Sequence, residues 1–367
     1  MDVLLFLLIM LAFLSAGRTI TGKIWLLNFK SPTEAFVFSS ALGSIIASVM
    51  VTTLAFLGQV SSLTCWGVLA ILFASGLGFL KELRKWKLKT VLTFSPLSPL
   101  KTSIQIILGT LFFLSLSLAL VPAFATDAMV YHLAVPKAYL EAGGVINLPN
   151  NIFSFYPQHT EMLYLLALAL GTDHLAQLTG LGIVFLLLIA LHQYYRQNSS
   201  ETYALLVPAL FLSTPTFFAV AYSGYVDLQA AAYTFMAFYA WENWRSRKQI
   251  GWFYLMTAFV GAALATKLSA IIALPIAFLG VVMQDEESPK KVLGHCLILA
   301  LGSLLLILPW WGRNYFFTGN PFAPFFMQIF GGDQGMNWDL ERSLQHFQYF
   351  STYGMGHGIL DFLLLPI

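Results

Sequence analysis

The sequence has little charge. Asp, Glu, Lys and Arg make up 10% of its 367 residues and hydrophobic residues 58%, whereas a soluble domain has about a quarter charged residues. The net charge of +2 gives no reason to expect nucleic acid as a partner. Cysteine is also scarce: Cys65 and Cys296 lie far apart, in predicted helices. A disulfide framework and a cysteine-based zinc site are therefore not expected.

The chain has instead many long hydrophobic runs. Several reach about 20 residues, the length that a helix needs to cross a bilayer, and they are continuous rather than alternating, unlike membrane strands. The fold class that we predict is an all-α polytopic membrane protein with about ten or more transmembrane helices. The predicted spans are 2–16, 34–57, 61–80, 102–121, 173–193, 202–222, 226–244, 251–266, 268–283 and 292–311.

We expect one transmembrane domain over 1–367. It would have N-terminal helices over 1–121, a large external loop with interfacial helices over 122–172, and the remaining helices over 173–367. The first run lacks a basic leader and a small-residue cleavage site, so we expect a retained helix rather than a signal peptide. The chain stops inside a further apolar segment, 359–367, as a piece of a longer protein would.

Basic residues gather in loops that the positive-inside rule assigns to the cytoplasm. These residues are Arg18, Lys23 and Lys30; Lys81, Arg84, Lys85, Lys87 and Lys89; Arg245, Arg247 and Lys248; and Lys290 and Lys291. With these loops inside, span 102–121 runs outward and delivers Asp127 to the external face. Segment 157–170 is short for a span. Interpreting it as an interfacial or re-entrant helix keeps every basic loop, and Arg196, on the cytoplasmic side.

This topology places many polar residues outside, above all in the stretch 122–161. Ionisable residues at a membrane edge are costly unless they are paired or functional, so we expect the site on the external face. Asp127 is the candidate general base. The candidate substrate-binding residues are Tyr131, His132, Tyr156, His159, Glu161, Asp227, Lys267, Arg313 and Asn314.

Each candidate has a structural alternative. Asp127 and Asp227 could each cap the helix that follows, and Glu161 could complement a helix dipole. His132 could be an interfacial hydrogen-bonding residue. Lys267 lies between two apolar runs with almost no loop, where snorkelling competes with a fixed positive charge for a lipid phosphate. For Lys267 we favour the functional interpretation.

Five segments that follow one another in the chain suggest a family. They are TDAMVYHLAVPKAYLE, FSFYPQHTEMLYLLALALG, SGYVDLQAAAYTF, GAALATK and LPWWGRNYFFTGNPFAPFF. In order and spacing, over roughly residues 120–326, they resemble the bacterial GT-C glycosyltransferases. More closely, they are similar to the group related to the lipid A aminoarabinose transferase and the protein O-mannosyltransferases. In the last segment, Arg313 is able to contact phosphate with two parallel hydrogen bonds.

The resemblance implies an inverting transfer from a polyprenyl-phosphate sugar donor, on the external face of the bacterial inner membrane. The acceptor would be a lipid, a glycan or a protein, and membrane lipids would be further partners. Asp127 matches the catalytic acid of the family's first large external loop. Lys267 matches the family's Thr-Lys pair, here Thr266-Lys267, for which a role at the donor phosphate is implied. That loop often carries two adjacent acids, whereas Ala128 follows Asp127 here, which leaves a divalent metal cofactor open.

Two other classes of protein compete with a transferase. A transporter or flippase of a lipid-linked sugar would carry polar or interrupted helices at the midplane. The charges of this chain cluster instead at one face, which favours the enzyme. A polytopic scaffold without chemistry would not need Lys267 or the polar outer loop.

Overall fold

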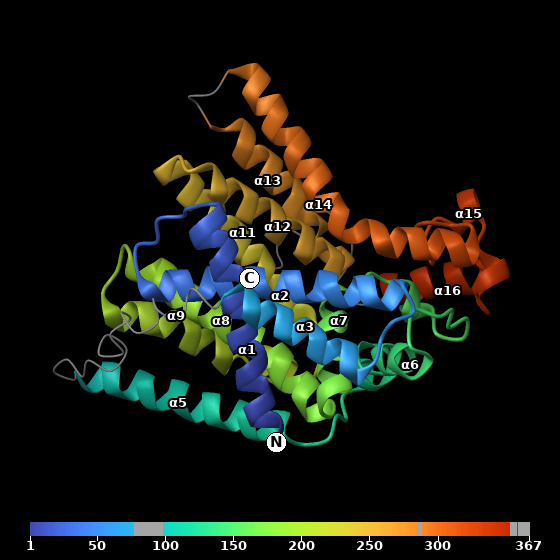
Figure 1. The fold of residues 1–367 in the computed structure, drawn as a ribbon, viewed down its shortest axis with the longest axis horizontal. Helices are drawn as coiled ribbons and strands as arrows, with labels where there is room; N and C mark the ends of the chain where they lie inside the picture. Colours follow the sequence, from blue (N-terminus) through green and yellow to red (C-terminus); the bar gives the residue numbers. More distant parts are fainter. Residues whose placement is uncertain (77–97, 285–287, 353–357, 359–367) are drawn as a thin grey trace. The chain divides into compact units, whose positions relative to one another are not determined.

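The computed structural model describes residues 1–76, 98–284, 288–352 and 358. These residues form helices and no strand, which confirms the prediction of an all-α fold (Figure 1). They belong to two compact units, Met1–Ile146 with Pro157–Ile307, and Asn147–Tyr156 with Leu308–Ile367. The expected single transmembrane domain thus comprises two units. The basic loop from Lys81 to Lys89 and the segment 359–367 lie outside the described residues.

Five helices of the described residues are long and apolar enough to cross a membrane. They are α1 (Asp2–Thr19) with its π-helical continuation Ile20–Ile24, α2 (Pro32–Phe56), α5 (Pro99–Ala119), α8 (Asp173–Arg196) and α14 (Pro289–Thr318). A sixth span results if α9 (Glu201–Ser213) and α10 (Pro215–Tyr222), bent by 76°, form one. The bend lies at Thr214, before Pro215, where a proline disfavours helical backbone. The chain is therefore a helical membrane protein.

The remaining predicted spans are helices that are short or polar. They are α3 (Ser62–Ser75), α11 (Asp227–Arg247), α12 (Ile250–Thr266) and α13 (Ala273–Val282). Helices α12 and α13 are short because the backbone becomes extended at Lys267 (φ −150°, ψ 128°) and then forms a 3-10 turn, Leu268–Ile272. A count of ten or more spans is therefore not confirmed.

A close contact between α1 and α2 organises the first unit. An added Cβ at Gly17 would lie 1.8 Å from the Ser39 carbonyl oxygen, and one at Gly43 would lie 1.8 Å from that of Phe13. Small residues allow membrane helices to approach so closely. Helices α11 and α12 also lie side by side (Figure 1).

Segment 157–170 forms α7 (His159–Leu170), which has 12 residues and is not among the helices long enough to cross a membrane. Its residues from His159 to Ala167 are all buried, and it contacts α2, α6 (Ala134–Ala142), α8 and α12. The expected interfacial or re-entrant helix is thus enclosed by protein over its first nine residues, His159 to Ala167, and partly exposed at its last three.

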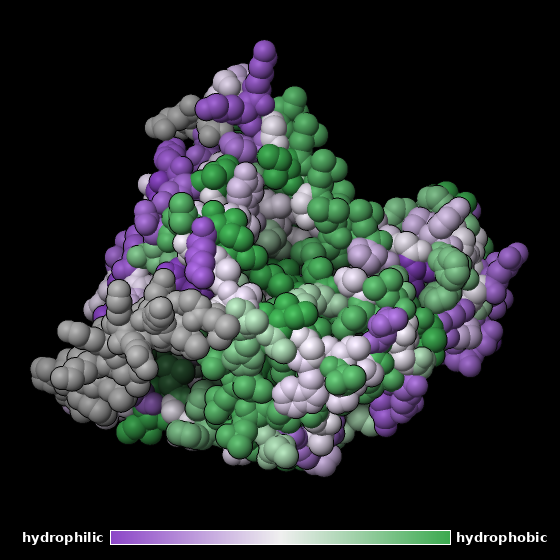
Figure 2. Space-filling view, in the orientation of Figure 1, coloured by the Kyte–Doolittle hydropathy of each residue, from purple (hydrophilic) through white to green (hydrophobic). Residues whose placement is uncertain are grey.

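The surface of several helices is apolar. In the most apolar part of α5, 17% of the residues are buried, and Ile106 and Phe113 are among its exposed side chains. Figure 2 shows hydrophobic residues over much of the face that it presents. Such a surface suits contact with lipid.

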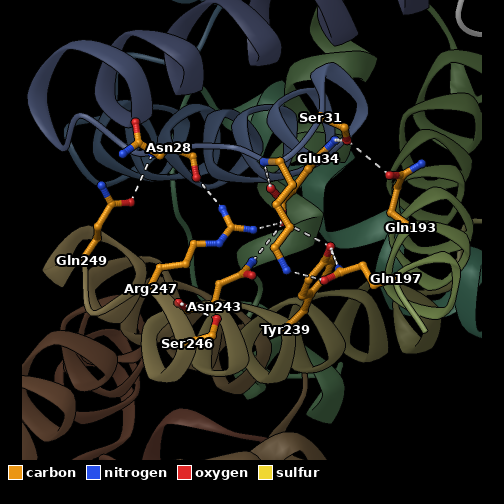
Figure 3. Close-up of polar contacts among 11 residues, drawn as sticks. Asn28, Ser31, Glu34, Gln193, Gln197, Tyr239, Asn243, Ser246, Arg247 and Gln249 are labelled. Carbon is orange, nitrogen blue, oxygen red and sulfur yellow. Dashed lines mark hydrogen bonds and ion pairs between the residues drawn. The ribbon is translucent and has the colours of Figure 1, made fainter.

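The first unit has two polar ends. At one end, the loops before α2, after α8 and after α11 meet: Lys30 Nζ donates to Gln197 Oε1 at 2.6 Å, and Arg247 bonds the Asn28 carbonyl (Figure 3). At the far end of α2, the Val145 N–H donates to the Ala55 carbonyl at 2.9 Å. Because α2 has 25 residues, the ends lie about 37 Å apart. Lys30, Arg247 and the loop after Arg196 therefore share one end, and Val145, from the expected external loop, lies at the other.

Candidate functional site

Asp127 lies at the start of a π-helical turn, Ala128–His132, between α5 and α6. Its backbone is helical and its side chain makes no capping hydrogen bond, so the capping alternative is wrong. Its Oδ2 accepts instead from the Tyr131 hydroxyl at 2.9 Å. Its N–H donates to the hydroxyl oxygen of Tyr225 at 3.4 Å. The residue is half-buried, with its carboxylate held by Tyr131 and its backbone N–H by Tyr225, and π-helical turns are frequent at functional sites.

Tyr131 lies among three carboxylates. Burial raises the pKa of its phenol well above the ordinary value, and the hydrogen bond to Asp127 and the charges of Asp127, Glu161 and Asp227 raise it further. The raised pKa keeps the phenol protonated. Tyr131 is therefore a constant hydrogen-bond donor to Asp127, and its phenol lies in the field of two further carboxylates.

A buried contact joins this turn to α7. His132 Nδ1 lies 2.8 Å from Glu161 Oε1, and both side chains are almost fully buried. The His132 ring lies 4.0 Å from that of Tyr131, between centroids. His132 Nε2 and Glu161 Oε2 are buried without a hydrogen-bond partner among the described residues. Glu161 also lies in the first turn of α7, so the dipole interpretation holds beside the pairing.

Lys267 and Asp227 form an ion pair. Asp227 begins α11 without capping it, and Lys267 lies at the backbone break after α12. The Lys267 side chain is 37% exposed and that of Asp227 is 42% exposed. They border an open groove of about 470 Å³, which continues along α11 past Ala230, Ala231, Thr234, Phe235 and Phe238. A charged pair thus stands at the end of a mostly apolar groove.

His159 does not join this cluster. It begins α7 two residues before Glu161, and residues two apart on a helix do not face each other. Its Nδ1 lies 3.0 Å from Ser48 Oγ on α2, and its ring packs edge-on against Tyr233 at 6.2 Å. Ser48 and Tyr233 both lie in the interior of the first unit. His159 therefore has a packing role in this structure.

Tyr156, Arg313 and Asn314 belong to the second unit. Arg313 Nη2 donates to the Tyr156 carbonyl at 3.0 Å, and Asn314 Nδ2 donates to the Phe155 carbonyl at 2.8 Å. Arg313 and Asn314 are 3% and 2% exposed. The Tyr156 ring stacks on Phe325 at 5.7 Å, and burial raises the pKa of its phenol. These contacts hold the segment 147–156 against the rest of the second unit.

Sequence reasoning missed three residues that organise the site. Tyr225 bonds Asp127 through its hydroxyl, and its carbonyl accepts from the Tyr164 hydroxyl at 2.8 Å. Thr160 lies 2.9 Å from Thr266, between hydroxyl oxygens, and ties α7 to the residue before Lys267. Tyr225 could have been predicted, because it lies in the polar turn from Tyr222 to Asp227. No sequence feature near Tyr164 or Thr160 indicates their contacts.

The residues do not fit a metal centre. In the described part of the chain, no group of three or more His, Cys, Asp or Glu side chains is arranged to hold a metal ion. Asp127 bonds Tyr131, Glu161 contacts His132, and Asp227 pairs with Lys267. Cys65 and Cys296 are both free thiols.

The chain belongs to the family described as "Domain of unknown function (DUF8201)", whose family model matches residues 2–362. No curated protein and no solved structure matches the chain. The family match spans both compact units, so every candidate residue lies within it.

Proposed function

We propose that the protein is an integral-membrane glycosyltransferase of the GT-C type. It moves a sugar from a polyprenyl-phosphate donor to an acceptor hydroxyl on the external face of the bacterial inner membrane. The observation that carries this proposal is the presence of two features in one unit: the Asp127 carboxylate held by the Tyr131 hydroxyl, and the Asp227–Lys267 ion pair at the end of a mostly apolar groove.

The groove suits a lipid-linked donor. From Asp227 to Phe238 it follows twelve residues of α11, a rise of about 16 Å, and its walls are mainly Ala and Phe side chains. In the proposal, the prenyl chain lies along these walls and the phosphate lies at Lys267, a compact positive charge that binds phosphate. Because Asp227 pairs with Lys267, the donor phosphate takes the place of Asp227 as the partner of the ammonium group.

Asp127 is the proposed general base. Tyr131 uses Oδ2, so we assign Oδ1 to the acceptor. As the acceptor oxygen attacks the anomeric carbon, its proton passes to Asp127, and the bond from that carbon to the phosphate oxygen breaks. The polyprenyl phosphate leaves with the electron pair and with its charge opposed by Lys267. The anomeric carbon is inverted because the acceptor attacks from the side opposite the phosphate.

Interrupted helices favour a second candidate, a flippase of a lipid-linked sugar. The backbone break at Lys267 and the 76° bend between α9 and α10 are interruptions of the kind that transporters use at their sites. A flippase would move the donor across the bilayer and leave the bond between sugar and phosphate intact.

The proposal is tested by transfer of label from a radiolabelled polyprenyl-phosphate sugar pool in membranes. Asp127→Asn removes the base and should lower the rate by roughly 10²–10⁴-fold. Glu242→Gln is the matched control, since Glu242 is a carboxylate in an exposed pair with Arg245 on α11. Equal rates for Asp127→Asn and the wild type, at equal amounts of inserted protein, would contradict the proposal.

A further inference from the structure

The end of the first unit opposite Asp127 has a polar network centred on Glu34 (Figure 3). Glu34 lies in the first turn of α2 and is 1% exposed. Its Oε1 accepts from Arg247 Nη2 at 2.7 Å, from the Tyr239 hydroxyl at 3.1 Å and from Asn243 Nδ2 at 3.2 Å. Its Oε2 accepts from the Lys30 N–H at 2.6 Å. Glu34 is thus a fully engaged anchor between α2 and α11, with its charge balanced by Arg247.

An open pocket of about 380 Å³ lies beside this network. Polar side chains from three segments line it. Lys30 Nζ donates to Gln197 Oε1 at 2.6 Å, and Gln197 Nε2 donates to the Tyr239 hydroxyl at 2.6 Å. Ser31 Oγ donates to Gln193 Oε1 at 3.2 Å. The ammonium group of Lys30 and the amide N–H groups of Gln193 and Gln197 are donors suited to an anionic oxygen.

The charges around the pocket leave an excess of positive charge. Glu34 is matched by Arg247, and Arg196, which also lines the pocket, pairs through Nε with Glu201 at 2.9 Å. The bond from Lys30 Nζ goes to a neutral amide. Three cations therefore face two carboxylates, which favours an anionic ligand.

Aromatic side chains adjoin the pocket. The Tyr194 ring lies 5.2 Å from that of Tyr239, 5.5 Å from that of Phe238 and 5.7 Å from that of Tyr195. Tyr195 and Phe238 are 44% and 39% exposed. Tyrosine is enriched at the level of the lipid headgroups, so this pocket has the surroundings of a site for a lipid rather than for a free solute.

We propose that this pocket binds the phosphate of an anionic membrane phospholipid. Lys30 and Arg196 contact the phosphate, Gln193 and Gln197 bond the polar headgroup, and the acyl chains lie over the neighbouring aromatic rings. Basic pockets between membrane helices on the cytoplasmic side are suited to such headgroups. The site lies at the end away from Asp127 and does not depend on glycosyl transfer.

The test is native mass spectrometry of the full chain, purified in a neutral detergent and titrated with short-chain phosphatidylglycerol. The wild type is expected to bind one molecule more tightly than it binds short-chain phosphatidylcholine. Lys30→Gln and Arg196→Gln should each weaken binding roughly tenfold, through loss of a charge-assisted contact. Lys290→Gln, which removes an exposed charge at the start of α14, should leave binding unchanged.

Three results would overturn the proposal. The first is wild-type affinity in both pocket variants, and the second is an equal loss in Lys290→Gln, which would indicate general surface charge. The third is binding of inorganic phosphate, in a separate titration, that depends on Lys30 while phosphatidylglycerol does not bind. The pocket would then be a site for free phosphate rather than for a lipid. Because Lys30 is exposed, Lys30→Gln is expected to leave the fold intact, and the thermal unfolding midpoint checks this.

Discussion

At the scale of single residues, Tyr131 is the residue that holds the Asp127 carboxylate. It donates to Asp127 from one turn away, and the charges of Glu161 and Asp227, from α7 and α11, act on it. Its protonated phenol keeps the Asp127 carboxylate in one orientation. Asp127 alone would have several rotamers, of which one faces the acceptor.

Tyr131→Phe is expected to lower the turnover rate at saturating donor by roughly tenfold or more. The change removes a hydrogen bond to a charged group, worth about 1.5–3 kcal/mol. Steady-state transfer kinetics measure the effect, and Tyr203→Phe, an exposed tyrosine on α9, is the control. An unchanged turnover rate in Tyr131→Phe would mean that the hydrogen bond has no part in transfer.

The raised pKa of Tyr131 also predicts a pH dependence. A raised pKa means that the protonated phenol is the favoured form, and it is lost as pH rises through that raised value. The hydrogen bond to Asp127 therefore persists beyond pH ~10, the ordinary pKa of tyrosine. Transfer rates measured up to that pH should therefore not fall because Tyr131 loses its proton. A fall that is present in the wild type and absent in Tyr131→Phe would contradict the assignment.

Glu161→Ala is expected to destabilise the protein by about 1–3 kcal/mol, because His132 Nδ1 loses its partner in the interior. Thermal unfolding in detergent measures the change. Glu201→Ala removes a partly exposed carboxylate from its pair with Arg196 and should cost less than about 1 kcal/mol. Equal midpoints for both variants would show that the buried contact adds no stability.

At the scale of helices, hydrophobic runs predicted where most elements lie, because a run of apolar residues about 20 long has few alternatives to a helix in a membrane. They also separated 251–266 from 268–283 at Lys267, where the backbone breaks, but they did not predict that a 3-10 turn follows and leaves α13 with only 10 residues. Nor could they pair Asp227 with Lys267 or His132 with Glu161, since these partners are far apart in sequence. His159 was misplaced for a related reason: its direction depends on where α7 begins.

Gly43→Ala is expected to destabilise the protein strongly, because the new methyl group would overlap the Phe13 carbonyl of α1 and force the two helices apart. Gly67→Ala on α3 is the matched control. Its Cβ would have no atom within 4 Å, and replacing glycine in a helix stabilises by about 0.4–1 kcal/mol. Unfolding midpoints of the two variants should move in opposite directions, and a Gly43→Ala midpoint at or above the wild type would contradict the helix contact.

At the scale of the whole molecule, the two polar ends of the first unit differ in charge and in chemistry. The end with Lys30 and Arg247 holds the loops before α2, after α8 and after α11, and the other end holds Asp127 and Lys267 of the candidate site. In the proposal, the positive-inside rule puts the end with Lys30 in the cytoplasm and Asp127 on the external face. The asymmetry of charge could be predicted from the sequence, because the basic residues of each loop are neighbours in the chain. Which loops meet at one end could not, because that depends on how the helices pack.

Single cysteines test this sidedness. Lys137→Cys, in the expected external loop, should react with a membrane-impermeant maleimide on cells whose outer membrane is opened. Asn198→Cys, after α8, should react only once the inner membrane is also permeabilised. Both positions are exposed. The wild type, with Cys65 and Cys296, sets the background, and the reverse pattern of labelling would place Asp127 in the cytoplasm.

The central claim is transfer, and the most direct measurement uses the purified chain in sealed vesicles with a polyprenyl-phosphate sugar labelled in both the sugar and the prenyl chain. We predict that the sugar label moves to an acceptor while polyprenyl phosphate is released, and that Asp127→Asn and Lys267→Ala both abolish this separation. If the two labels stay together and cross the bilayer as one molecule, the protein is a flippase and Asp127 is not a catalytic base.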